Sequence, residues 1–154
     1  MKALEDRRQE LKRRGQLPEP VRRQEATQAT LDKFKGKAFS WQGATCAHLL
    51  RYHLRMMGHK PPAIPAFRSP ISARTAMKKL GGDNIADVLR AIGMPEIPPA
   101  MMMLGDVAVL PGDDGIFDAI TINAGVKLMG WHPDAEGLVV MDVDPTAVIA
   151  AFRV

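Results

Sequence analysis

Apolar residues recur at the spacing of amphipathic helices through the first two thirds of the chain. Over residues 1–16 the pattern is thin, because charged positions leave little more than Leu4 and Leu11 on one face, and Gly15 is placed to end this helix. The apolar spacing predicts four further helices, over residues 21–34, 46–57, 72–80 and 85–92.

The pattern changes to that of strands after Leu104. Short runs of β-branched and apolar residues are separated by glycine, proline and asparagine, and Asp113-Asp114-Gly115 is typical of a solvated hairpin loop. The predicted strands are residues 106–110, 117–123, 126–131 and 138–143. Because the helices come first and the strands last, we predict an α+β fold with a small antiparallel sheet.

The charge is unevenly distributed along the chain. Residues 1–104 have an excess of ten basic side chains, whereas residues 105–154 have an excess of six acidic ones, within a net charge of +4. We predict a basic helical N-terminal arm at residues 1–30 and a compact domain at residues 31–154. The first twenty residues fit either a flexible tail or an arm that becomes ordered against another subunit.

Composition excludes several classes of protein. A single cysteine leaves no intramolecular disulfide and no multi-cysteine zinc site. No apolar stretch is long enough to span a membrane, and the charged first residues lack the pattern of a secretory signal. Neither a metal-binding spacing nor a phosphate-binding glycine motif is present, so we expect no cofactor. Charge alone, without a compact recognition motif, does not favour a nucleic-acid partner.

Cys46 is the first candidate for chemistry. It follows Thr45, a potential cap, at the predicted N-terminus of a helix, where unpaired amides favour a thiolate. The alternative is a small buried apolar residue. A cysteine nucleophile needs a histidine base. His48 points away around the helix, His53 lies about 10.5 Å along it, and His132 is the histidine that the sheet can carry toward the thiol.

Four short motifs follow one another in a recognisable order. They are Trp41 to Cys46, Gly105-Asp106-Val107, Gly137-Leu138-Val139 and Phe152-Arg153-Val154. In this order the chain resembles the NlpC-type branch of the papain-like cysteine peptidases. It is more similar to a set of small phage tail proteins related to that branch. The resemblance covers residues 31–154 and implies a papain-like fold, leaving the basic arm unexplained.

The resemblance also assigns roles to single positions. Enzymes of this family cleave peptide crosslinks of peptidoglycan, with a cysteine nucleophile that corresponds to Cys46. Their histidine base, at the head of a strand after the Gly-Asp strand, falls on Asp118, and their third polar residue falls near His132. A carboxylate is a weak base near neutral pH, and its charge opposes thiolate formation. The resemblance therefore implies a catalytically degenerate site.

The function implied by the resemblance is structural. We expect a subunit made in the host cytoplasm and built into the virion, at the tip of a phage tail or tail-like particle. Its expected partners are distal-tail, hub and fibre-bearing proteins. Two alternatives remain: an active peptidase acting on peptidoglycan, with Cys46 as nucleophile and His132 as base, and a nucleic-acid-binding protein that uses the basic arm.

Overall fold

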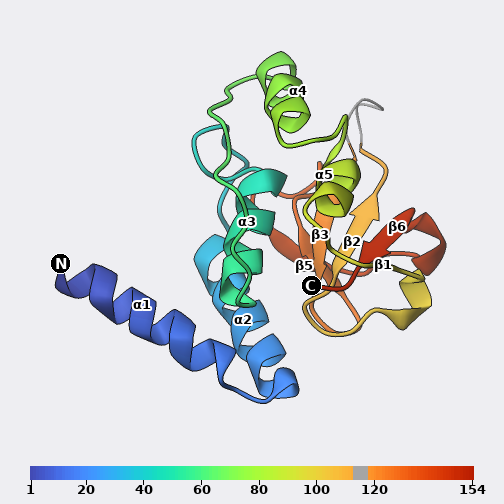
Figure 1. Cartoon of the computed structure of the whole chain (residues 1–154). Coiled ribbons are helices and arrows are strands. Elements are labelled where there is room, and N and C mark those ends of the chain that lie inside the picture. Colours follow the sequence, from blue (N-terminus) through green and yellow to red (C-terminus); the bar gives the residue numbers. More distant parts are fainter. Residues whose placement is uncertain (113–117) are drawn as a thin grey trace.

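The structure is a computed structural model that describes residues 1–112 and 118–154 (Figure 1). The predicted loop at residues 113–115 and the expected first strand residue, Phe117, lie outside this part of the chain. The helices of the described part are α1 (Lys2–Gly15), α2 (Glu19–Phe34), α3 (Cys46–Met56), α4 (Pro70–Lys79) and α5 (Ile85–Ala91), with 3-10 turns at Pro99–Met101 and Pro145–Ala147. The strands are β1 (Glu96–Ile97), β2 (Val107–Leu110), β3 (Ala119–Asn123), β4 (Leu128–Gly130), β5 (Val139–Met141) and β6 (Ala150–Phe152).

The described strands form one sheet in the order β1-β6-β2-β3-β4-β5, and all neighbours are antiparallel. The predicted α+β class and antiparallel sheet are therefore confirmed. The sequence pattern missed β1 and β6. The C-terminal strand β6 lies beside β2 near the middle of the sheet, with Phe152 opposite Val107, so the end of the chain is a central part of the fold.

Helices α2 and α3 lie side by side, and α3 packs on β3 (Figure 1). Their apolar faces and the facing side of the sheet form the core. Its largest fully buried side chains include Phe34, Leu49, Leu54, Ile120, Ile122 and Phe152. Because α3 is fixed between α2 and the sheet, its first turn is held against the head of β3.

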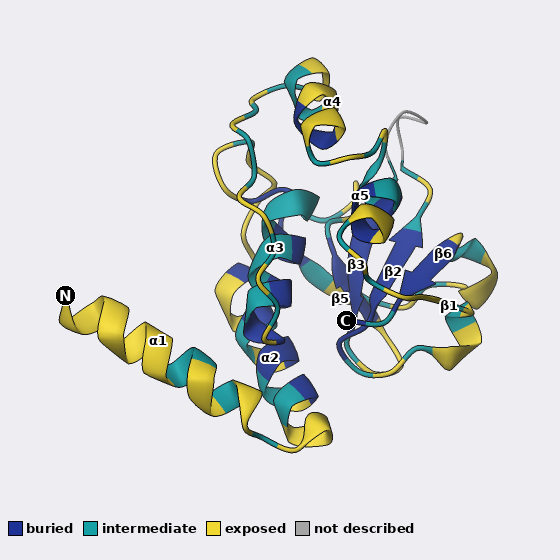
Figure 2. Cartoon of the chain, viewed as in Figure 1, coloured by how far each residue is buried: buried dark blue, intermediate teal, exposed yellow. Residues whose placement is uncertain are grey.

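Helix α1 has no buried residue, and most of its surface is exposed (Figure 2). In contrast, α2 buries Ala26, Thr30 and Phe34, the face that its sequence pattern indicates. The packed part of the chain therefore begins with α2, and not after residue 30, where the sequence predicted the start of the compact domain. Arg23 is buried, which the basic composition of residues 21–30 did not indicate. No helix in the described ranges is long and apolar enough to cross a membrane.

Candidate functional site

A pocket of about 410 Å³ lies where the first turn of α3, helix α4 and the head of β3 meet. Cys46 and Asp118, two residues singled out from the sequence, both line it. Trp131, at the position next to the third candidate, lines it as well. The rest of the wall is mainly apolar and includes Phe39, Trp41, Phe67, Met77, Leu80 and Ile85. The pocket thus brings together Cys46 and Asp118 but does not include His132.

Local hydrogen bonds place Cys46 at the start of α3. The Thr45 hydroxyl accepts a hydrogen bond from the backbone N–H of His48 at 3.3 Å, and the Thr45 N–H donates to His48 Nδ1 at 3.4 Å. This capping box satisfies amides of the first turn and fixes where the helix begins. The predicted cap at Thr45 is confirmed, and it explains why residue 46 is the first residue of the helix.

The environment of Cys46 opposes its ionisation. The side chain is partly buried. Burial raises the pKa of the Cys46 thiol above its ordinary value, and a backbone hydrogen bond from Ile120 in β3 offsets only part of this rise. A helix N-terminus favours a thiolate, but the apolar surroundings dominate here. Cys46 is therefore a protonated thiol near neutral pH.

None of the three histidines considered as a base lines the pocket in the described structure. His132 is 47% exposed, and its Nδ1 accepts a hydrogen bond from the N–H of Asp134 at 3.1 Å. His48 uses its Nδ1 in the cap of α3 and stacks on Phe67, with 5.7 Å between ring centroids. Burial, and then the charge of Arg51, lowers the pKa of His48.

His53 is fully buried between α2 and the sheet. Its Nε2 lies 2.7 Å from the carbonyl oxygen of Gly105, and its Nδ1 lies 2.8 Å from Thr30 Oγ1. Since a carbonyl only accepts, the ring carries its proton on Nε2. Burial lowers the pKa of His53 to about 4, although the bond to Gly105 acts in the opposite direction. This histidine is a neutral structural residue.

Aromatic rings form a continuous wall on one side of the pocket. Phe39 packs edge-on against Trp41 and Trp131, at centroid distances of 5.2 and 6.1 Å, and Trp41 packs in the same way against Phe67 at 5.9 Å. The Trp131 indole donates to the carbonyl oxygen of Lys37 at 2.8 Å. Such edge-to-face contacts fix ring positions, so the wall is preorganised.

The structure also contains a buried polar cluster that sequence reasoning missed. Asp106 is completely buried, and its Oδ2 accepts from Arg153 Nε and from the Met103 N–H, both at 2.8 Å. Its Oδ1 accepts from Arg23 Nη1 at 3.0 Å and from the Val154 N–H at 3.2 Å. Two motifs behind the resemblance, Gly105-Asp106-Val107 and Phe152-Arg153-Val154, therefore meet at one carboxylate. Their role here is structural.

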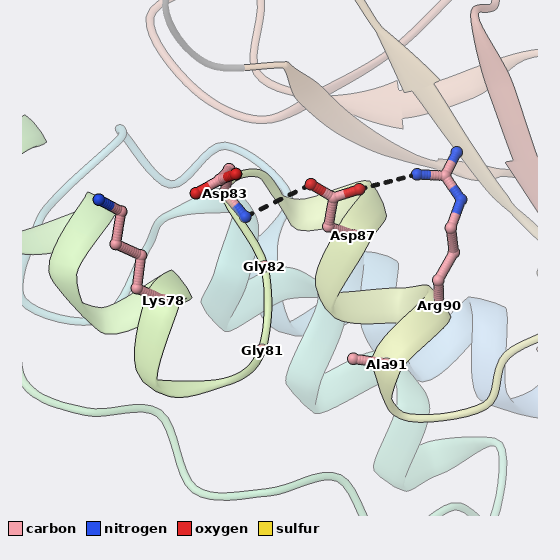
Figure 3. Close-up of a pocket in the computed structure, with 7 residues that line it drawn as sticks. All are labelled: Lys78, Gly81, Gly82, Asp83, Asp87, Arg90 and Ala91. Carbon is pink, nitrogen blue, oxygen red and sulfur yellow. Dashed lines mark hydrogen bonds and ion pairs between the residues drawn. The ribbon is translucent and has the colours of Figure 1, made fainter.

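A second, open hollow of about 710 Å³ lies at the turn between α4 and α5 (Figure 3). The carboxylate of Asp87 in this hollow is already engaged, since it accepts from the Asp83 N–H at 3.4 Å and from Arg90 Nη1 at 3.0 Å. Gly82 fits tightly there, because a Cβ would lie 2.4 Å from the Cβ of Asp87. No group of three potential metal-ligating side chains occurs in the part of the chain that the structure describes.

The fold is an α+β domain in which a cysteine at the start of a helix and an aspartate at the head of a strand line one mainly apolar pocket. Residues 21–154 match the family described as a domain of unknown function, DUF6950, and the chain belongs to this family. The matched region begins with α2 and leaves out α1, the exposed helix. No curated protein sequence matches the chain significantly.

Proposed function

We propose that this protein is a structural subunit of a phage tail tip or tail-like particle. Its domain is a papain-like, NlpC-type fold without the peptidase reaction, and it joins distal-tail, hub or fibre-bearing proteins in the virion. The observation that carries the proposal is the pocket, which is lined both by Cys46 and by Asp118, the residue that the resemblance aligns with the family's histidine.

The chemistry of the pocket supports loss of catalysis. A cysteine peptidase needs an imidazole beside the thiol to form and hold a thiolate. Here the residue that the resemblance aligns with this histidine is Asp118, which lines the same pocket as Cys46, while burial raises the pKa of the Cys46 thiol. The aromatic and aliphatic wall that remains suits packing against an apolar segment of a neighbouring protein.

The layout of the chain supports a role in assembly. Helix α1 projects from the domain without burying a residue and carries six basic side chains and three acidic ones (Figure 2). An exposed helix of this kind gains stability when it packs on another subunit. It also lies outside the family match, as expected of a segment that is adapted to a particular neighbour.

The test is complementation of particle assembly. Particles from cells that encode the chain are purified and analysed by mass spectrometry, alongside particles from cells in which it is deleted. We expect the chain at fixed stoichiometry and incomplete tails in the deletion. We expect full rescue by the wild type and by Cys46→Ala, because the thiol has no chemical role. Absence of the chain from particles would overturn the proposal.

The peptidase alternative keeps one favourable observation, the position of Cys46 at the first turn of α3 inside a pocket. It is tested on purified peptidoglycan with the wild-type chain and Cys46→Ala. Release of peptide fragments by the wild type but not by the variant would replace the structural proposal. We expect no release by either protein.

A further inference from the structure

A group of cationic side chains gathers where α1, α2 and the end of α3 meet. Arg51 and Arg55 lie one helical turn apart on α3, about 6 Å along its axis, and His59 follows just beyond its end. Arg7 on α1 and Arg22 on α2 lie close enough to act electrostatically on Arg55 and His59, respectively. We call these five residues the cationic stripe.

The stripe has no carboxylate partner in the described structure. The ion pairs of α1 and α2 use other arginines, namely Arg13, Arg14 and Arg23. Arg51 donates only to a neutral group, the carbonyl oxygen of Pro62 at 3.1 Å. The Nε atom of Arg22 is buried without a hydrogen-bond partner in the ranges described. Donors of the stripe are thus unused.

Holding these cations together costs free energy. Burial lowers the pKa of Arg55, and the charges of Arg7 and then Arg51 add to this effect. Burial also lowers the pKa of His59, with Arg22 acting in the same direction. Like charges at partly buried positions repel one another, since low dielectric strengthens their interaction. An anion placed among them would relieve this repulsion.

We propose that the cationic stripe is a docking surface for an acidic segment of a neighbouring protein. Carboxylates two residues apart on an extended chain are about 6.7 Å apart, close to the axial spacing of Arg51 and Arg55. Guanidinium groups bind carboxylates through paired hydrogen bonds, which gives such a contact defined geometry. The inference rests on the proposed function, which supplies neighbouring subunits, and it names the chemistry of one of them.

The surroundings favour an acidic protein over a nucleic acid. Proteins that bind single-stranded nucleic acid interleave cations with exposed aromatic rings, on which bases stack. The aromatic side chain of this region, Tyr52, instead packs edge-on against Phe34, with 5.7 Å between centroids, and Lys33 Nζ lies 4.8 Å from its ring centroid. A nucleic acid would therefore be held at the stripe through its phosphates alone, without stacking of its bases.

The experiment measures binding of labelled oligopeptides to the full chain by fluorescence anisotropy at low and physiological ionic strength. The probes are an alternating Glu-Ala peptide, a Lys-Ala peptide of equal length, and oligothymidylate of equal charge. We expect the acidic peptide to bind best. Arg51→Gln with Arg55→Gln should weaken it at least about tenfold. Lys78→Gln with Lys79→Gln, which removes two exposed charges from α4, should leave it unchanged.

A stability measurement separates docking from a structural role. Since the arginines repel one another, Arg55→Gln should unfold at an equal or higher temperature at low salt, and the acidic peptide should raise the Tm of the wild type alone. If the double variant Arg51→Gln with Arg55→Gln does not fold, Arg7→Gln on the exposed α1 provides the same test of peptide binding. Equal peptide binding by wild type and stripe variants would overturn the inference. Tighter binding of oligothymidylate than of the peptide would replace it with a nucleic-acid surface.

The two proposals fail separately. If the wild-type chain does not bind the acidic peptide but is still incorporated into particles, the docking surface is refuted and the tail function stands. Absence from particles, with the stripe-dependent peptide binding retained, would refute the tail function and leave an acidic partner of another assembly.

Discussion

Arg23 on α2 and Asp106 immediately before β2 form an ion pair, with 3.0 Å between Nη1 and Oδ1, and both side chains are almost completely buried. Arg23 also donates to the terminal residue, from Nη2 to the carbonyl oxygen of Val154 at 3.0 Å. The pair therefore connects the second helix, the central strand and the end of the chain. Buried charges are tolerated when every polar atom is satisfied, and the four donors around Asp106 meet that condition.

Replacing the carboxylate of Asp106 should destabilise the fold strongly. Asp106→Asn removes the charge that balances Arg23 and should lower the free energy of unfolding by about 3–5 kcal/mol. The measurement is urea denaturation at neutral pH. Glu10→Gln, which breaks exposed ion pairs of α1, is the control and should cause a much smaller change. Similar small effects of both variants would contradict a structural role for the buried pair.

Stability should also depend on pH through His53. Its pKa is about 4 in the folded chain, against about 6.5 when unfolded. Above pH 6.5 the ring is neutral in both states, and below it the unfolded chain binds the proton first. The free energy of unfolding should therefore fall by about 3 kcal/mol as pH decreases from 6.5 to 4.

Urea unfolding of wild type and His53→Gln across this pH range measures the effect. The variant should lose less stability on acidification, although not none, because the lowered pKa values of His48 and His59 act in the same direction. Parallel pH profiles for the two proteins would show that His53 is not the group responsible.

Gly137 should tolerate no side chain. An added Cβ would lie 2.4 Å from the carbonyl carbon of Gly36, and hydrogen bonds hold this contact, since the Gly36 N–H donates to Leu138 at 3.1 Å. We expect Gly137→Ala to lower the free energy of unfolding by about 1–3 kcal/mol or more. Gly15→Ala, where nothing lies within 4 Å, is the matched control and should leave the Tm nearly unchanged. Equal Tm values for both variants would contradict the close approach.

Local signals explain which elements the sequence predicted. The cap at Thr45 and the apolar face of residues 46–57 determine α3 almost to the residue, because both act within one helix. Strand β6 has no such signal. Its three residues include two alanines, which have low strand propensity, and it is a strand because Phe152 lies opposite Val107, distant in sequence.

The candidate site follows the same division. Cys46 is a candidate from its place at a predicted helix start, Asp118 only from the resemblance, and the structure places both in one pocket. Burial of Arg23 and His53 could not be read from their own segments, since a charged or titratable side chain enters a core only when remote partners satisfy it. Those partners, Asp106 and Gly105, come from the other end of the domain.

The reactivity of Cys46 provides the most direct test of the degenerate site. Because burial raises the pKa of this thiol, iodoacetamide should alkylate it more slowly in the folded chain than in urea, and its pH profile should be shifted upward. The single cysteine makes the unfolded chain its own control. A folded profile shifted below the usual pKa of about 8.5 would instead indicate an activated nucleophile and favour the peptidase.

Placing an imidazole at residue 118 should lower the raised pKa of the Cys46 thiol. Asp118→His places a potential base in the pocket that contains Cys46, and an imidazolium there would favour the thiolate. We expect alkylation near neutral pH to become faster in this variant than in the wild type, whereas Asp118→Asn, which removes the charge without adding a base, should have a smaller effect. Since both variants change one side chain at the pocket wall, a difference between them isolates the imidazole. Equal rates in the two variants would mean that residue 118 does not face the thiol, and the histidine position of the resemblance would have to be assigned elsewhere.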